Sequence, residues 1–207
     1  MSTKKIVLIG LLAAIATIVY YSVKDETPAG YIEEIEKDRK ERNYFMRNND
    51  ASPFAGDEAN FTELKFFPID GNYRINASLT PAEPKKIIEL PTSDGKKQRY
   101  STYAYAEFSL DGIKCKLLIL EVMDMGPNKG MLFLAFGDQT SAVETYGAGR
   151  YLDVKKVPGS TSITLDFNLA YNPYCAYNDT YSCPLPPKEN LLPVAIRAGE
   201  KIYHEPL

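Results

Sequence analysis

The chain has 207 residues, a formal net charge of −3, 44% hydrophobic and 12% aromatic residues, with 15 tyrosines and no tryptophan. This length allows one domain with appendages, and the composition excludes a disordered chain and gives no support to a nucleic-acid partner. Because His204 is the single histidine, a metal site built from several histidines is excluded, and a histidine-dependent triad would need a residue near the C-terminus.

Residues 1–24 show the clearest pattern of the sequence, that of a membrane-spanning or signal segment. Lys4 and Lys5 precede an uncharged apolar run, residues 6–23, with Tyr20 and Tyr21 near its end. As a helix this run would be about 27 Å long, close to the roughly 30 Å hydrocarbon core of a bilayer. Lysines on the short N-terminal side predict a cytoplasmic N-terminus and a periplasmic or extracellular C-terminal domain. We expect a single-pass anchor in the lipid bilayer; a cleaved signal sequence is the alternative and implies the same compartment.

A polar linker, residues 25–30, and an amphipathic helix, residues 31–50, are expected next. Ile32, Ile35 and Tyr44 recur at near-helical spacing among charged residues, which is typical of a solvated helix with a thin apolar stripe. The remaining residues, 51–207, are expected to form a β-rich domain.

The β-rich domain shows short alternating apolar segments separated by turns. Asp94-Gly95 and Asp111-Gly112 predict hairpin turns, so residues 99–109 and 113–122 should pair antiparallel. The absence of crossover helices argues against a parallel sheet. We therefore predict a mainly β fold, an antiparallel sandwich or small barrel, preceded by a transmembrane helix and one amphipathic helix. The expected strands cover residues 64–67, 73–79, 86–90, 99–109, 113–122, 131–136, 162–171 and 191–197.

The cysteines suggest two kinds of role. Cys115 lies on the apolar face of an expected strand, which predicts a buried, inert thiol. Cys175 and Cys183 bracket a short polar loop, and outside the cytoplasm they could form a disulfide that stabilises by roughly 2–3 kcal/mol. The alternatives are a reactive Cys175 thiolate, which would need a nearby cation or helix N-terminus, a two-cysteine metal site, for which two further ligands are not evident, or two unpaired structural thiols.

Residues 136–154 form a polar constellation around a short Gly-x-Gly sequence. Backbone N–H groups there and the Arg150 guanidinium could bind an anion. The simpler interpretation is a structural turn in which Arg150 pairs with Asp138, Asp153 or Asp166. Nothing in the spacing selects a pair of carboxylates for acid–base catalysis, and no cofactor or metal is indicated. The full set of candidate ligand-binding residues is Asp138, Glu144, Arg150, Asp153, Asp166, Asn168, Tyr171, Asn172 and Glu189.

Several long motifs occur in an order that resembles one family. They are GRYLD (149–153), LDFNLAYNPYCAYN (165–178), CPLPPKEN (183–190) and AGEK (198–201). The chain resembles, over about residues 37–205, an uncharacterised bacterial family catalogued as domain of unknown function 1684. The resemblance implies a family and no activity, so no catalytic residue can be carried over.

Two hypotheses follow. In the first, the chain is a membrane-anchored extracytoplasmic domain that binds an unknown small molecule or protein partner, or serves a structural role in the cell envelope. In the second, it is an enzyme acting on a small anionic or sugar-like substrate. Arg150 would then orient the substrate, Asp166 or Glu189 would move protons, and Cys175 would be a candidate nucleophile.

Overall fold

The computed structural model describes residues 27–123, 127–156 and 159–204. The expected anchor, residues 1–24, lies outside the described residues. Within the described part of the chain, no helix is long and apolar enough to cross a membrane. The transmembrane helix of the expected fold therefore has no support from the structure and stays a prediction. The chain divides into two compact units, residues 1–42 and 43–207.

The one long helix of the described residues, α2 (Pro28–Asn48), begins in the first unit and ends in the second. Thr27 caps it, because its hydroxyl accepts a hydrogen bond from the Gly30 N–H at 3.0 Å. Proline suits the first helical position, where its missing N–H costs nothing. The Asn48 side chain donates to the Tyr44 carbonyl at 2.7 Å where the helix ends. The predicted helix is confirmed, and it starts three residues earlier than expected because of this cap.

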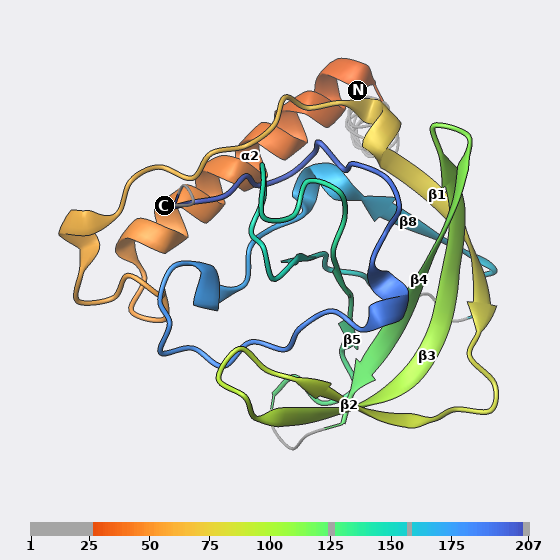
Figure 1. Ribbon diagram of the computed structural model, residues 1–207. Helices are drawn as coiled ribbons and strands as arrows, with labels where there is room; N and C mark the ends of the chain where they lie inside the picture. The colour runs from red at the N-terminus through yellow and green to blue at the C-terminus, as the bar shows by residue number, and fades with distance from the viewer. Residues whose placement is uncertain (1–26, 124–126, 157–158, 205–207) are drawn as a thin grey trace, which may run out of the picture. The chain divides into compact units, whose positions relative to one another are not determined.

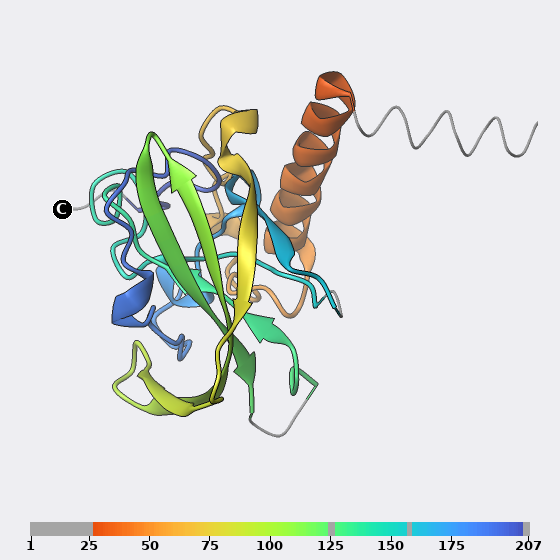
Figure 2. The same ribbon diagram turned by 90° about the vertical axis from the view of Figure 1, so that its right-hand side faces the viewer.

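The second unit is built on one antiparallel sheet of six strands (Figures 1 and 2). The spatial order is β5-β4-β3-β1-β8, with β2 also paired to β3. A separate two-stranded ladder joins β6 and β7. The strands are β1 (Arg74–Pro81), β2 (Ile87–Pro91), β3 (Lys97–Leu110), β4 (Ile113–Val122), β5 (Leu132–Phe133), β6 (Ala135–Phe136), β7 (Arg150–Tyr151) and β8 (Ser162–Asp166).

Both predicted hairpins are present. Leu110 pairs with Ile113, and the turn between them has Asp111 at φ 51° and Gly112 at φ 77°. Positive φ at both central residues matches the right-handed twist of the strands, which is why Asp-Gly favours this turn. The second turn, between β2 and β3, has Gly95 at φ 79°.

The long strand β3 changes partner along one edge. Its first half pairs with β2 and its second half with β1, and its register against β4 shifts between Thr102 and Ala104. The bulge in β3 moves the even-numbered side chains of β3 from one apolar cluster to another. Strand β4 is buried on both faces, so its alternating side chains contribute to both clusters. Leu117 and Ile119 belong to the main core, whereas Leu118 and Leu120 pack with Tyr100 and Leu90.

The predicted sandwich or closed barrel is not formed by the described residues. The sheet is open, and its main core is completed by irregular segments that contribute Leu192, Val194 and Ile196. Residues 191–197 were expected as a strand. Pro193 cannot donate a backbone hydrogen bond, and the Ile196 N–H donates to the Asp138 carboxylate instead of to a neighbouring strand. Residues 64–67 make only a single bridge, between Phe66 and Glu200.

Strand β8 also stops earlier than expected. The Asp166 carboxylate accepts the Asn168 N–H at 3.1 Å and starts the 3₁₀ turn η3 (Phe167–Leu169). Such local side-chain hydrogen bonds compete with continued strand pairing. The alternation that predicted a strand to residue 171 therefore includes a turn.

Asn190, at the end of the 3₁₀ turn η5 (Lys188–Asn190), covers part of the edge of β4. Its side chain accepts the Leu118 N–H at 2.6 Å and donates to the carbonyls of Leu118 and Ala135 at 2.9 and 2.7 Å. These backbone groups would otherwise be unpaired on a buried strand edge.

Candidate functional site

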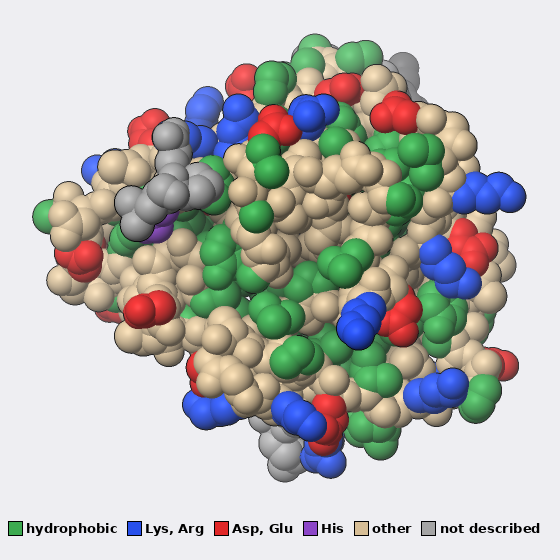
Figure 3. All heavy atoms as spheres, viewed as in Figure 1, with side chains coloured by type: hydrophobic (Ala, Val, Ile, Leu, Met, Phe, Trp, Pro, Cys, Tyr) green, Lys and Arg blue, Asp and Glu red, His purple; other side chains and the backbone are tan. Residues whose placement is uncertain are grey.

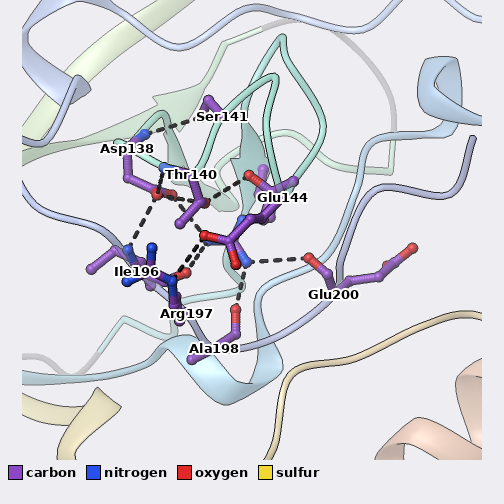
Figure 4. Close-up of polar contacts among 10 residues, drawn as sticks. Asp138, Thr140, Ser141, Glu144, Ile196, Arg197, Ala198 and Glu200 are labelled. Atoms are coloured by element: carbon purple, nitrogen blue, oxygen red, sulfur yellow. Dashed lines mark hydrogen bonds and ion pairs between the residues drawn. The ribbon is translucent and has the colours of Figure 1, made fainter. Parts of the chain in front are cut away.

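Arg150, the residue expected to contact a ligand or pair within the fold, is buried at the start of β7. Figure 4 shows polar contacts around Asp138, Thr140, Ile196 and Ala198. Its guanidinium contacts the Asp138 carboxylate at 2.9 Å, and the two side chains are 0% and 1% exposed. It also donates to the carbonyls of Ile196 at 2.8 Å, of Glu200 at 3.2 Å and of Ala198. Burial lowers the pKa of Arg150, and the neighbouring Asp138 charge opposes this shift.

Asp138 is equally engaged. Its Oδ1 accepts the N–H and hydroxyl of Thr140 at 2.8 and 2.6 Å and the Ile196 N–H at 3.2 Å. Of the three partners that the sequence left open for Arg150, the structure selects Asp138. The pair connects the loop after β6 to the C-terminal segment. Both terminal nitrogens of Arg150 are engaged inside the fold, whereas its Nε is buried with no hydrogen-bond partner among the described residues.

Two other predicted residues hold segments together. Asn168 is buried, and its amide exchanges hydrogen bonds with the backbone of Asp70 at 3.0 and 2.8 Å. Asn172 is also buried, and its backbone and side-chain N–H groups donate to the Glu200 carboxylate at 3.2 and 2.9 Å. Tyr177 donates its hydroxyl to the same carboxylate.

The sequence did not identify Glu200 as a buried polar residue. It is 0% exposed. Its position inside the AGEK motif, directly after a turn glycine, resembled a solvated turn, and only its spatial neighbours reveal its role. The remaining predicted carboxylates lie elsewhere: Glu144 pairs with exposed Arg197 at 2.8 Å, Asp166 lies 3.9 Å from Arg74, and Glu189 is exposed on η5.

Two predicted residues, Asp153 and Tyr171, meet in a pocket of about 360 Å³. We call it the aromatic pocket, because four rings line it. The Tyr171 hydroxyl donates to the Asp153 carboxylate at 2.8 Å. Its principal lining residues are Gln98, Tyr100, Phe133, Tyr151, Asp153 and Tyr171.

The four rings of the aromatic pocket form a continuous series. Tyr100 stacks on Phe133 with centroids 5.0 Å apart, Phe133 meets Tyr151 edge-on at 5.0 Å, and Tyr151 meets Tyr171 edge-on at 6.0 Å. The Tyr151 hydroxyl donates to the Pro184 carbonyl at 2.7 Å, and burial raises its pKa. The rings are therefore held by one another and by the backbone.

Sequence reasoning did not connect three of these rings to a site. Tyr100 belonged to an alternating strand and therefore looked like ordinary core, and Phe133 and Tyr151 lie in short elements on different sides of a long loop. The high tyrosine content was a signal that such rings exist, but it did not indicate which of them gather.

A second pocket, of about 400 Å³, is mainly apolar, and Leu185, Leu191 and Leu192 are among its lining residues. Figure 3 shows hydrophobic side chains gathered near the middle of the face that it draws. Its polar groups are engaged within the chain: Gln139 donates to the Pro193 carbonyl at 2.9 Å, and Asp138 is paired with Arg150. This pocket therefore offers few polar groups to orient a ligand.

The predicted disulfide is not formed: Cys175 and Cys183 are free thiols in the structure. They are nevertheless close, since the Cys175 N–H donates to the Cys183 sulfur at 3.1 Å. The Tyr146 hydroxyl donates to the Cys175 sulfur at 3.8 Å. Cys115 is buried, as expected, and burial raises its pKa.

The pKa values of the two neighbouring thiols are shifted in opposite directions. A hydrogen bond from the Cys183 thiol, helped by the Tyr146 hydroxyl, lowers the pKa of Cys175 to about 6. The same interaction and burial raise the pKa of Cys183. The sequence predicted that a cation or helix N-terminus would be needed to stabilise a thiolate; the structure uses neutral donors instead.

No group of three or more histidine, cysteine or acidic side chains in the described ranges is arranged to hold a metal ion.

Comparisons with known proteins identify relatives but no activity. A family model described as "Protein of unknown function (DUF1684)" matches residues 59–201. The solution NMR structure of the uncharacterized protein from gene locus rrnAC0354 of Haloarcula marismortui is similar, with 35% identity and a TM-score of 0.65, covering 87% of this chain and 100% of that chain. No curated protein matches the chain significantly. The family match covers most of the β-rich unit and agrees with the motifs found in the sequence: the chain belongs to the DUF1684 family.

Proposed function

We propose that this chain is a membrane-anchored binding protein whose aromatic pocket takes a small organic ligand. The observation that carries the proposal is the pocket itself, in which four aromatic rings and a few polar groups line about 360 Å³. Pockets for small molecules combine mostly apolar walls with a small number of polar groups that fix orientation. Rings held by mutual packing also lose little conformational freedom when a ligand binds.

The charge of the lining narrows the ligand class. Asp153 is the single charged side chain among the described residues that line the pocket. Among the described residues, Tyr171 is its one hydrogen-bond partner, so the second carboxylate oxygen can accept a hydrogen bond from a ligand. A carboxylate beside the negative faces of aromatic rings disfavours an anion. We therefore propose a neutral, sugar-like ring or an organic cation.

Binding can be tested with the full-length chain purified in mild detergent. We would screen neutral sugars, organic cations and matched carboxylates by ligand-observed NMR. A neutral or cationic compound should bind, and Phe133→Ala should abolish this binding. Glu144→Gln, a surface change outside the pocket, is the matched control. A panel in which only anions bind, or binding that survives Phe133→Ala, would overturn the proposal.

The proposed location rests on the sequence. Residues 6–23 would anchor the chain in the bilayer, with the N-terminus in the cytoplasm and the β-rich unit in the periplasm or outside the cell. The full chain should stay in the membrane fraction after alkaline washing, and a protease added outside spheroplasts should digest the β-rich unit. A freely soluble full-length product in the cytosol would contradict this arrangement.

The alternative is an enzyme acting on a small anionic or sugar-like substrate. Its version with Arg150 and Asp166 or Glu189 has little support, because Arg150 is engaged by Asp138 and carbonyls, whereas Glu189 is exposed on η5. The version with Cys175 has a specific observation in its favour, the lowered pKa of this thiol, to about 6.

A further inference from the structure

The Cys175–Cys183 pair combines a thiolate with a neighbouring thiol. The Cys175 sulfur accepts the Tyr146 hydroxyl at 3.8 Å, and the Cys183 sulfur accepts the Cys175 N–H at 3.1 Å. The neighbouring Cys183 thiol and the Tyr146 hydroxyl lower the pKa of Cys175, and the pKa of Cys183 is raised, so Cys175 is the sulfur that loses its proton first. Since the thiolate is the nucleophilic form of cysteine, the two sulfurs have different parts in any reaction.

The surrounding hydrogen bonds fix the second sulfur in place. The Cys183 N–H donates to the Ser93 hydroxyl at 3.0 Å, and the Ser93 N–H donates to the Cys183 carbonyl at 2.8 Å. Cys183 is 7% exposed, so bulk reagents have little access to it. Its main available reaction partner is therefore Cys175.

Cys175 is the more accessible of the two. It is partly exposed and lines a pocket of about 530 Å³ together with Asn60, Asn178 and His204. His204 is exposed. A pocket of this size admits a small molecule to the neighbourhood of Cys175. The third cysteine, Cys115, is buried and has no comparable access.

We propose that Cys175 is a site of reaction with small hydroperoxides and that Cys183 resolves the oxidised product to a reversible disulfide. The inference concerns a second site and does not depend on ligand binding in the aromatic pocket. The free thiols of the structure are the reduced state of this pair.

The chemistry balances in two steps. The Cys175 thiolate attacks one peroxide oxygen, an S–O bond forms, the O–O bond breaks, and the departing oxyanion takes a proton from solvent. Cys175 is oxidised by two electrons to a sulfenic acid, and the peroxide is reduced to an alcohol or water. The Cys183 sulfur then attacks the Cys175 sulfur. Hydroxide leaves and takes the Cys183 proton, so that water and a disulfide are formed.

The test uses reduced full-length protein in mild detergent, treated with hydrogen peroxide. Two of the three thiols should become unavailable to maleimide, and the intact mass should fall by about 2 Da as two hydrogens are lost. Peptide mapping should join Cys175 to Cys183, and a dithiol reductant should restore both. Cys115→Ser is the matched control and should oxidise at the unaltered rate.

Substitutions at Cys183 and at Cys175 separate formation of the sulfenic acid from its resolution to the disulfide. In Cys183→Ser the sulfenic acid has no resolving thiol, so dimedone should label Cys175; Cys183→Ala provides the same readout if the serine variant folds poorly. In Cys175→Ser, oxidation of the remaining thiols should be at least about tenfold slower. Wild-type oxidation rates in Cys175→Ser, or dimedone labelling that is absent from Cys175 in both Cys183 variants, would overturn the proposal.

Discussion

The Asp138–Arg150 pair and the Cys175–Cys183 pair are both polar, yet their surroundings differ. Arg150 and Asp138 are closed off from solvent, with side chains 0% and 1% exposed, and they bind carbonyls and backbone N–H groups of neighbouring segments. Cys175 is partly exposed, its sulfur is contacted by weak donors, and it lines a pocket. The comparison teaches that Arg150, although charged, has a structural role because it is buried and paired. Cys175, which is accessible and has a lowered pKa, is the candidate for chemistry.

The largest expected effect is from breaking the buried ion pair. Asp138→Ala leaves the Arg150 charge buried without its partner, which should destabilise the fold by about 3–5 kcal/mol. Urea unfolding followed by circular dichroism measures this loss. Asp138→Asn keeps the shape and some hydrogen bonds and should cost less.

The matched control for this prediction is the exposed Glu144–Arg197 pair. Its side chains are 34% and 59% exposed, so Glu144→Gln should change stability by at most about 1 kcal/mol. Equal losses for Asp138→Ala and Glu144→Gln would show that burial does not distinguish the two pairs.

The next effect concerns the edge of β4. Asn190→Ala removes three hydrogen bonds and leaves the backbone groups of Leu118 and the Ala135 carbonyl without their partner. Unsatisfied buried groups of this kind should cost about 2–3 kcal/mol in unfolding free energy. Glu189→Ala, which changes the exposed neighbour, should be nearly neutral; a similar loss there would point to the turn itself rather than to the Asn190 amide.

Much of the sheet could be predicted because its signals are local. The Asp-Gly turns and the alternation of residues 99–109 predict β3 and β4, and these are the longest strands of the structure. The sandwich could not be distinguished from the observed open sheet, because residues 191–197 have an apolar pattern but are held by contacts with distant residues such as Asp138. Partners with large sequence separation leave no mark on local periodicity.

The candidate site was harder to predict for the same reason. Asp153 and Tyr171 were named, but the pocket depends on Tyr100 and Phe133, which come from strands far apart in the sequence. The closeness of Cys175 and Cys183 was predicted from their spacing. Their acidities depend on the Cys183 thiol and the Tyr146 hydroxyl, which only the fold brings to Cys175.

The acidity difference predicts a pH dependence of stability. The pKa of Cys175 is lowered from 9.0 to about 6 in the folded state. Between these pH values the unfolded chain binds more protons, so stability should rise with pH. The contribution should be lost as pH falls through about 6. Urea midpoints of reduced protein at several pH values measure this slope, and Cys175→Ser should flatten it.

The contributions of the Tyr146 hydroxyl and the Cys183 thiol to the pKa of Cys175 can be separated by removing the hydroxyl alone. Tyr146→Phe keeps the ring and removes the hydroxyl that donates to the sulfur at 3.8 Å. The pKa of Cys175 should rise, and iodoacetamide labelling near neutral pH should slow about two- to fivefold because less thiolate is present. Tyr181→Phe is the control, because Tyr181 lies in the loop between Cys175 and Cys183. Labelling that is unchanged in Tyr146→Phe would leave the Cys183 thiol as the main donor.

The smallest expected effect on stability concerns the aromatic pocket. Asp153 is exposed, and its hydrogen-bond partner among the described residues is the Tyr171 hydroxyl, so Asp153→Asn should change unfolding free energy by no more than about 1 kcal/mol. Binding of a cationic ligand should nevertheless weaken markedly, because the charge that faces it is lost, whereas binding of a neutral ring should change little. Thermal melts and ligand titrations on one preparation separate the two quantities. Asp153 is therefore expected to matter for binding and hardly for folding, whereas Asp138 is expected to matter for folding. A large stability loss in Asp153→Asn would remove that distinction.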